Sequence, residues 1–157
     1  MAKVALVSPK GIQLIEQFEC SGNVENYLKA YKCPAGVWTI GFGTTIYPNG
    51  KKVKEGDVCT REQAYHYLRN DLIYTEDQVD ALTIDSINQN QFDSLISFAY
   101  NIGIGALRSS MLLRKVNSNP NDPSIRNEFI KWIFEDALRL PELVARRNAE
   151  ADLYFSI

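Results

Sequence analysis

A carboxylic acid, a thiol and a hydroxyl lie in the first third of the sequence. Glu19 ends a short amphipathic segment in which Ile12 and Ile15 precede it at helical spacing, so these three residues share one face. A carboxylic acid at the end of such an apolar stripe is partly removed from water and keeps its proton more readily, as a general acid must. Cys33 and Thr39 follow in a segment typical of β-structure. The pattern predicts a general acid that faces a β wall.

The predicted wall is a hairpin with glycines in its second strand. Residues 31–36 indicate the end of a strand entering a turn, and residues 37–43 a second strand interrupted by Gly41 and Gly43. Glycine in a strand usually marks a bulge or a place where a ligand or another backbone comes close. By alternation Thr39 shares a face with Gly41, so we expect its hydroxyl to point into the site.

Turn and cap signals place the elements that must position these groups. Ser8 and Pro9 supply a cap and a proline at the first helical position, which predicts a helix over residues 9–19. Residues 20–58 are rich in turn signals and include a predicted hairpin over residues 44–53. These segments together predict a small α+β lobe.

The second half of the chain carries helical signals only. A capping box at Thr60 and Gln63 opens a helix expected to reach about residue 80. The later signals are an apolar stripe over residues 92–99 ended by Gly103 and Gly105, a cap at Asp122 and Pro123 before the apolar run 129–133, and Pro141. These signals predict an all-helical second lobe.

Several runs of residues carry a resemblance to a known family. They are residues 11–19, residues 30–43, residues 90–93 with 98–103, Trp132, Leu140 with Pro141, and Arg146 and Arg147 with Glu150. In these runs the chain resembles the phage-type lysozymes, the endolysins of glycoside hydrolase family 24. The resemblance implies an α+β, lysozyme-like fold. We expect a lobe with β-hairpins over residues 1–59, a connecting helix over residues 60–80, and a larger helical lobe over residues 81–157.

The resemblance also implies an activity and three catalytic roles. The activity is hydrolysis of the β-1,4 bond between N-acetylmuramic acid and N-acetylglucosamine in peptidoglycan, which lyses the bacterial host. Such cleavage needs a proton on the leaving oxygen while positive charge develops on the sugar. We expect Glu19 to donate it, and Cys33 and Thr39 to place water on the opposite face, with inversion and without a cofactor. The alternatives are a buried hydrophobic role for Cys33 and a plain strand role for Thr39.

The spacing of the acid departs from the family pattern. The family has eight residues between the acid and an Asp or Cys, whereas thirteen separate Glu19 from Cys33 here, and five separate Cys33 from Thr39 in both. An insertion within residues 20–26 accounts for the excess and leaves Glu25 as a rival acid. We favour Glu19 because it ends the apolar helix, whereas Glu25 lies in a polar stretch typical of a loop.

Four further side chains are candidates for binding the glycan, each with a second interpretation. Trp38 and Phe42 suit stacking on sugar rings, but aromatic residues in a short strand are commonly part of a core. Gln91 and Asn101 suit hydrogen bonding to the glycan, but such amides also cap helices.

Two arginines of the last predicted helix are candidates for a supporting role. Arg146 and Arg147 lie at or beside an inward stripe, where an arginine normally has a partner. The functional partner would be Glu19, which an ion pair would hold in place. The alternative partner is Glu150 or Asp152.

The remaining reactive side chains predict no further chemistry. Cys20, Cys33 and Cys59 have no metal-ligand spacing, and we expect no metal and mostly reduced thiols. Thr44 stands where many relatives of the family carry His, so no buried His ion pair is expected there. His66 is predicted to be a solvated surface residue.

Composition sets limits on the partners. The chain has 157 residues, of which 45% are hydrophobic and 23% charged, which suits one monomeric unit of two small lobes. A net charge of −2 gives no sign of nucleic-acid binding. Residues 2–7 are too short for a signal core or anchor, and no later run approaches the roughly 20 residues of a spanning helix. We therefore expect a host-cytoplasmic protein, released to the periplasm and cell wall by a separate holin, that binds peptidoglycan glycan strands.

Two other functions stay open from the sequence. One is a non-catalytic peptidoglycan-binding or phage structural module that kept the fold and lost the chemistry, which the displaced Glu19 and the presence of Cys33 would favour. The other is a lytic transglycosylase, which uses one Glu and forms an anhydro product without water.

Overall fold

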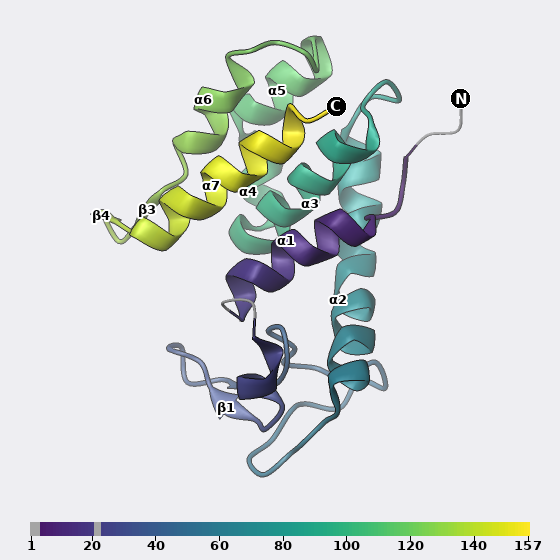
Figure 1. Cartoon of the computed structure of the whole chain (residues 1–157), viewed down its shortest axis with the longest axis vertical. Helices are drawn as coiled ribbons and strands as arrows, with labels where there is room; N and C mark the ends of the chain where they lie inside the picture. The colour runs from purple at the N-terminus through teal and green to yellow at the C-terminus, as the bar shows by residue number, and fades with distance from the viewer. Residues whose placement is uncertain (1–3, 21–22) are drawn as a thin grey trace. The chain divides into compact units, whose positions relative to one another are not determined.

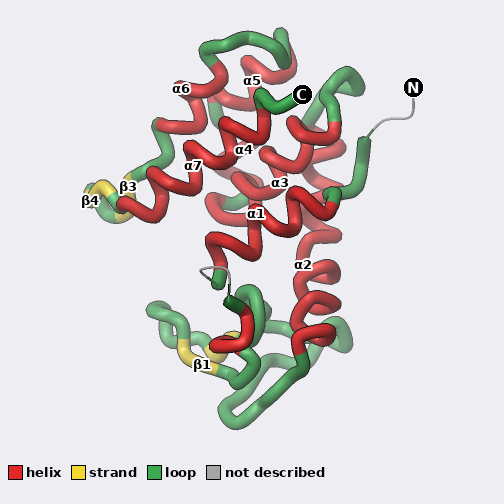
Figure 2. Tube along the Cα trace, in the orientation of Figure 1, coloured by secondary structure: helices red, strands yellow, loops and turns green. Residues whose placement is uncertain are grey.

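The computed structural model describes residues 4–20 and 23–157, and the described chain is mostly helical (Figures 1 and 2). In chain order the first elements are α1 (Pro9–Glu19), the 3-10 helix η1 (Val24–Tyr27), β1 (Tyr31–Lys32), β2 (Trp38–Thr39) and α2 (Arg61–Leu82). They are followed by α3 (Gln89–Ile102), α4 (Ile104–Ser109), α5 (Met111–Ser118), α6 (Ile125–Ile130), β3 (Phe134–Glu135), β4 (Leu138–Arg139) and α7 (Pro141–Tyr154). No helix in the described ranges is long and apolar enough to cross a membrane.

The chain forms two compact units. One, the hairpin unit, comprises residues 15–73, and the other, the helical unit, comprises the residues up to Leu14 together with Tyr74–Ile157. Helices α1 and α2 each have residues in both units. The last turn of α1, which ends at Glu19, therefore belongs to the hairpin unit.

In the hairpin unit, β1 and β2 pair antiparallel. Tyr31 lies opposite Thr39 and Lys32 opposite Trp38, and residues directly opposite each other project on the same face of a sheet. Trp38 packs with Tyr47, Cys59 and Tyr67 around a small buried cluster made by Ala30, Ile40 and Val53. The two faces of the hairpin therefore differ, because Trp38 packs against this cluster while Tyr31 and Thr39 lie on the other side.

A tight turn follows β2 and requires glycine at its start. Ile40 and Thr44 exchange backbone hydrogen bonds of 2.9 and 3.0 Å across the turn. Gly41 has φ +63, and a Cβ placed there would lie 3.1 Å from the Cβ of Ala64. A side chain at Gly41 would meet both the left-handed backbone penalty and the α2 helix.

In the helical unit, α3 is the central element, and α7 lies beside it and packs against both α3 and α6 (Figure 1). The capping box of α3 joins Asn88 and Gln91, and Gly103 ends α3 with φ 102. Phe98 of α3 meets Phe129 of α6 edge to face at a centroid distance of 5.8 Å. The apolar stripe predicted over residues 92–99 is thus the core of this unit.

Most of the predicted helix boundaries are confirmed. Helix α1 begins at Pro9 and ends at Glu19, and α7 begins at Pro141. The box that opens α2 has both its hydrogen bonds, from Thr60 N to Gln63 Oε1 at 2.9 Å and from Gln63 N to Thr60 Oγ1 at 3.1 Å.

Other predicted boundaries are wrong or incomplete. Gly105 does not end α3 but lies inside α4, and α6 ends at Ile130, before the rest of the apolar run. The hairpin predicted over residues 44–53 pairs only through a single bridge between Ile46 and Lys52. The β3–β4 hairpin was not predicted at all.

Candidate active site

The proposed acid lies where α1 is joined to the turn after β2. Glu19 is half-buried at the last position of the helix. The buried thiol of Cys20 donates to the Gly41 carbonyl oxygen at 3.4 Å. Burial, followed by the charges of Glu19 and Glu16, raises the pKa of Cys20 to about 12. Cys20 is therefore a neutral structural thiol that holds the end of the helix against the hairpin.

Tyr31 connects the acid with the rest of the site. Burial is the main cause that raises the pKa of Tyr31 to about 12, and the charges of Cys20, Tyr27, Glu19 and Cys33 add to it. Tyr31 therefore stays a neutral hydroxyl, and it was not among the site residues predicted from the sequence. Across the hairpin, Tyr31 lies directly opposite Thr39. The sequence signal that could have identified Tyr31 is its place opposite Thr39 in a hairpin with a short turn.

The turn between β1 and β2 lowers the pKa of the Cys33 thiol. Hydrogen bonds from the Val37 amide, the Ala35 amide and the Thr39 hydroxyl lower the pKa of the half-buried Cys33, although partial burial opposes them. The Thr39 hydroxyl also donates to the Val37 carbonyl oxygen at 3.0 Å. A hydroxyl has one proton, so it can serve only one of these acceptors at a time and can accept from a water with its lone pairs.

The rival acid Glu25 lies in η1 on the surface. Its side chain is 54% exposed and pairs with Arg61, with 3.3 Å between Arg61 Nη1 and Glu25 Oε1. A solvated carboxylate paired with an exposed arginine suits a surface role.

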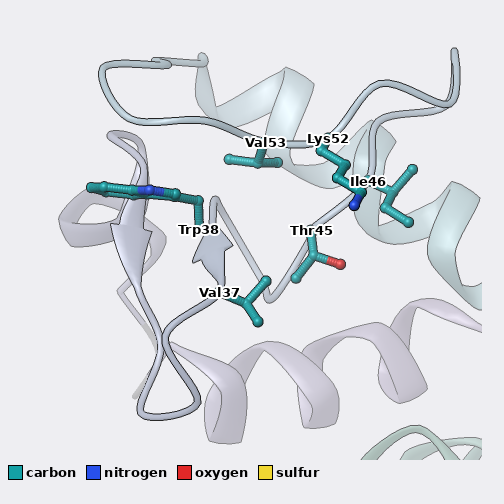
Figure 3. A pocket seen from close by; sticks show the side chains of 6 residues that line it. All are labelled: Val37, Trp38, Thr45, Ile46, Lys52 and Val53. Atoms are coloured by element: carbon teal, nitrogen blue, oxygen red, sulfur yellow. The ribbon is translucent and has the colours of Figure 1, made fainter.

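The two aromatic candidates lie in different surroundings. Phe42 is completely buried, with its ring centroid 4.9 Å from that of Tyr65, so it supports the wall from behind. Trp38 is half-buried and lies opposite the Thr39 face, with the Lys32 Nζ atom 5.4 Å from its ring centroid. Trp38 also lines a pocket of about 280 Å³ in the hairpin unit, together with Val37, Thr45, Ile46, Lys52 and Val53 (Figure 3).

The two amide candidates lie in the helical unit. Gln91 is buried and forms the capping box of α3, and its Nε2 atom donates to the Pro120 carbonyl oxygen at 3.3 Å. The helix-capping interpretation therefore describes Gln91 in this structure. Asn101 is exposed at the end of α3, and its side-chain oxygen accepts from the Arg147 guanidinium.

Both arginines belong to a buried polar network of the helical unit. Arg147 Nη1 lies 2.5 Å from Glu150 Oε1, and Arg147 Nε donates to the Trp132 carbonyl oxygen at 3.1 Å. Arg146 Nε lies 3.4 Å from Glu150 Oε2, which also accepts from the Ser97 hydroxyl at 2.6 Å. Glu150, the alternative partner predicted from the sequence, is thus a partner of both arginines. The pairing with Glu19 stays a prediction.

A mostly helical fold with a small hairpin unit is that of a lysozyme-like protein. The chain belongs to the phage lysozyme family, whose model matches residues 23–150. The predicted resemblance and the lysozyme-like fold are therefore confirmed.

Individual relatives match nearly the whole chain. The endolysin of Acyrthosiphon pisum secondary endosymbiont phage 1 is 36% identical over 154 residues, which cover 96% of this chain and 98% of that protein. The endolysin of Bacillus phage B103 is 38% identical over 96% of this chain, but the match spans only 54% of that longer protein. The crystal structure of a P22 lysozyme mutant matches with a TM-score of 0.84 at 32% identity, covering 98% of this chain and 100% of that one.

Proposed function

We infer that the chain is an endolysin of the muramidase type, a glycoside hydrolase that degrades peptidoglycan. Its membership of the phage lysozyme family and its whole-length similarity to phage endolysins support this function. We further propose that it hydrolyses the β-1,4 bond between N-acetylmuramic acid and N-acetylglucosamine. The observation that carries the proposal is that one compact unit holds the Tyr31–Thr39 pair of the hairpin together with the end of α1 at Glu19, where Cys20 is hydrogen-bonded to Gly41.

In the proposed mechanism, Glu19 protonates the glycosidic oxygen as the bond from this oxygen to the anomeric carbon breaks. Water held by Thr39 and Cys33 attacks the anomeric carbon from the opposite face. The water loses its proton to the Cys33 thiolate, and the hydrogen bonds of the turn favour this form by lowering the pKa of Cys33. Displacement by water from the face opposite the leaving group inverts the anomeric configuration. Solvent then returns a proton to Glu19 and takes up the proton from Cys33.

The other predicted residues take supporting places in this mechanism. Phe42 is buried behind the wall, and we propose that it fixes the turn after β2 rather than stacking on a sugar. Asn101 is exposed and held by Arg147, so it is available to a glycan. We propose that an ion pair between Glu19 and Arg146 or Arg147 orients the acid. Action as a monomer and release to the wall by a separate holin are also proposed.

Turbidity clearing of purified peptidoglycan by the wild type, Glu19→Gln and Glu25→Gln tests the acid. The amide keeps the shape of the side chain and removes the transferable proton. We expect Glu19→Gln to lose at least about 100-fold in rate, as is common when a general acid is removed, and Glu25→Gln to keep wild-type activity. Loss in Glu25→Gln alone would transfer the acid role to the surface residue. Circular dichroism of each variant checks folding.

The products distinguish the remaining functions. Hydrolysis adds water to the cleaved bond, whereas a lytic transglycosylase releases an anhydro product that is lighter by one water. Mass spectrometry of the released muropeptides should therefore show the hydrated species. A folded wild type that binds peptidoglycan but releases no muropeptide would instead mean a binding module. Proton NMR at early times should show the α-anomer that inversion predicts.

A further inference from the structure

Positive charge is concentrated in one segment of the hairpin unit. Residues 26–54 contain five lysines and no acidic residue, a charge of +5, whereas the rest of the chain carries −7. All five lysines are exposed; they are Lys29, Lys32, Lys51, Lys52 and Lys54. This segment surrounds the pocket of Figure 3 and attracts an anionic ligand despite the acidic balance of the whole chain.

The pocket lining combines an aromatic wall, methyl groups and a cation. Figure 3 shows the Trp38 indole at one end and Ile46 with Lys52 at the other. Methyl groups of Val37 and Val53 lie between these ends, and Val53 also belongs to the buried cluster beneath. The pocket can therefore hold small apolar groups close to an ammonium group.

The size and place of the pocket indicate which part of a wall polymer fits. At about 280 Å³ it is smaller than the roughly 300 to 1,000 Å³ of sites for drug-sized ligands, which suits one or two small residues better than a disaccharide. Trp38 lies on the opposite face from Thr39, whereas Val37 lies two residues before Thr39, so the pocket borders the catalytic wall. Lys32, 5.4 Å from the Trp38 ring centroid, adds a second cation beside the aromatic wall.

We propose that this pocket binds the stem peptide of peptidoglycan, through its alanine methyl groups and its carboxylates. The inference rests on the proposed function, because the stem peptide is attached to the glycan that the enzyme cleaves. The methyl groups would contact Val37 and Val53, and a carboxylate would pair with Lys52. The pocket thereby selects a glycan that carries peptide over a bare glycan.

The test compares two substrates and two lysine variants. The substrates are glycan strands with intact stem peptides and the same strands stripped by an amidase. Lys52→Gln removes the cation of the pocket, and Lys51→Gln is the matched control, because Lys51 is an exposed neighbour that does not line the pocket. Lys52→Gln should raise KM about fivefold on peptide-bearing strands, the upper range for one exposed ion pair. Its kcat on these strands, its kinetics on stripped strands and both constants of Lys51→Gln should stay unchanged.

Several results would overturn the proposal. An equal rise of KM for both variants would mean a general basic surface without a specific pocket. An equal effect of Lys52→Gln on stripped strands would mean that the pocket binds sugar. Lys52-dependent binding to phosphatidylglycerol vesicles, with KM on the wall unchanged, would assign the pocket to a lipid surface.

A binding experiment separates this inference from the activity. Titration with a soluble stem tripeptide should shift the Trp38 indole N–H signal in NMR spectra of the wild type and leave that of Trp132 unmoved. This shift does not require cleavage, so it tests the pocket even if peptidoglycan is not hydrolysed. No shift at Trp38, with hydrolysis intact, would refute the pocket assignment and leave the proposed function standing.

Discussion

Replacing Thr44 with valine should destabilise the hairpin unit by an amount that grows as the pH rises. The Thr44 hydroxyl is 1% exposed and donates to Asp71 Oδ2 at 2.7 Å. Valine has the same shape but no donor, so the carboxyl group of Asp71 loses this partner. Burial raises the pKa of Asp71 above its ordinary value of 3.8, and the hydrogen bond from Thr44 opposes that rise.

The sign of the pH dependence follows from the raised pKa of Asp71. The folded state keeps the Asp71 proton over a pH range in which the unfolded state has lost it, so the free energy of unfolding falls as the pH rises through that range. Thr44→Val raises the pKa of Asp71 further, because the hydrogen bond from Thr44 had lowered it. The free energy of unfolding therefore falls more steeply with pH in this variant. A lost hydrogen bond costs about 1 kcal/mol with a neutral acceptor and about 2 kcal/mol with a charged one. We therefore expect a loss of about 1 kcal/mol near pH 4 and about 2 kcal/mol near pH 7.

Urea unfolding followed by far-ultraviolet circular dichroism measures this difference. Thr45→Val is the matched control, since it makes the same change at the next, half-buried residue, and should cost less than about 0.5 kcal/mol at either pH. In an Asp71→Asn background, the additional loss at neutral pH should disappear. A cost of Thr44→Val that is equal at both pH values, or larger in acid, would refute this account of the Asp71 carboxyl.

Three further outcomes are expected. Gly41→Ala should lower the free energy of unfolding, measured by thermal unfolding, by about 2 kcal/mol, and Gly50→Ala by about 1 kcal/mol. Both glycines have positive φ, but only a side chain at position 41 would meet a neighbouring side chain. Equal costs would contradict this contact. Arg147→Lys should lower the free energy of unfolding by about 2 kcal/mol, since an ammonium group cannot replace the guanidinium group that binds both the Trp132 carbonyl and the Glu150 carboxylate. An unchanged free energy of unfolding would show that this double contact is dispensable. Cys33→Ser should lower kcat at neutral pH about 100-fold. It should also remove the part of the pH–rate profile in which kcat rises with pH, because the thiolate is the proposed base. An unaltered pH profile would exclude Cys33 as the base.

The helix boundaries were predictable because they depend on short-range signals. Pro9 and Pro141 each fill a first helical position, where a missing N–H costs nothing. The box at Thr60 and Gln63 satisfies the first amides of α2 without any distant partner. Such signals need only a few neighbouring residues, so they can be recognised in a single sequence.

The features that were missed depend on backbone strain or on distant partners. Asp136 and Ala137 have φ of 48 and 67 in the turn between β3 and β4, where Asn-Gly is the usual signal. Without that signal, this hairpin has no local signature.

The candidate site was predicted in part for the same reason. Glu19 could be proposed as the acid because it ends an apolar stripe that the sequence displays. The position of Tyr31 opposite Thr39 depends on the register of the hairpin, which joins two separate segments. The burial of Phe42 depends on its packing against Tyr65 of α2, which alternation along one strand cannot reveal.

The contrast between the three cysteines makes one of them a selective chemical handle. Burial raises the pKa of Cys20 to about 12 and also raises that of Cys59, whereas hydrogen bonds lower that of Cys33. Alkylation requires the thiolate, so iodoacetamide at mildly alkaline pH should modify Cys33 first. One label per molecule, at Cys33, would then mark a folded chain, whereas an unfolded chain would take up label at all three thiols.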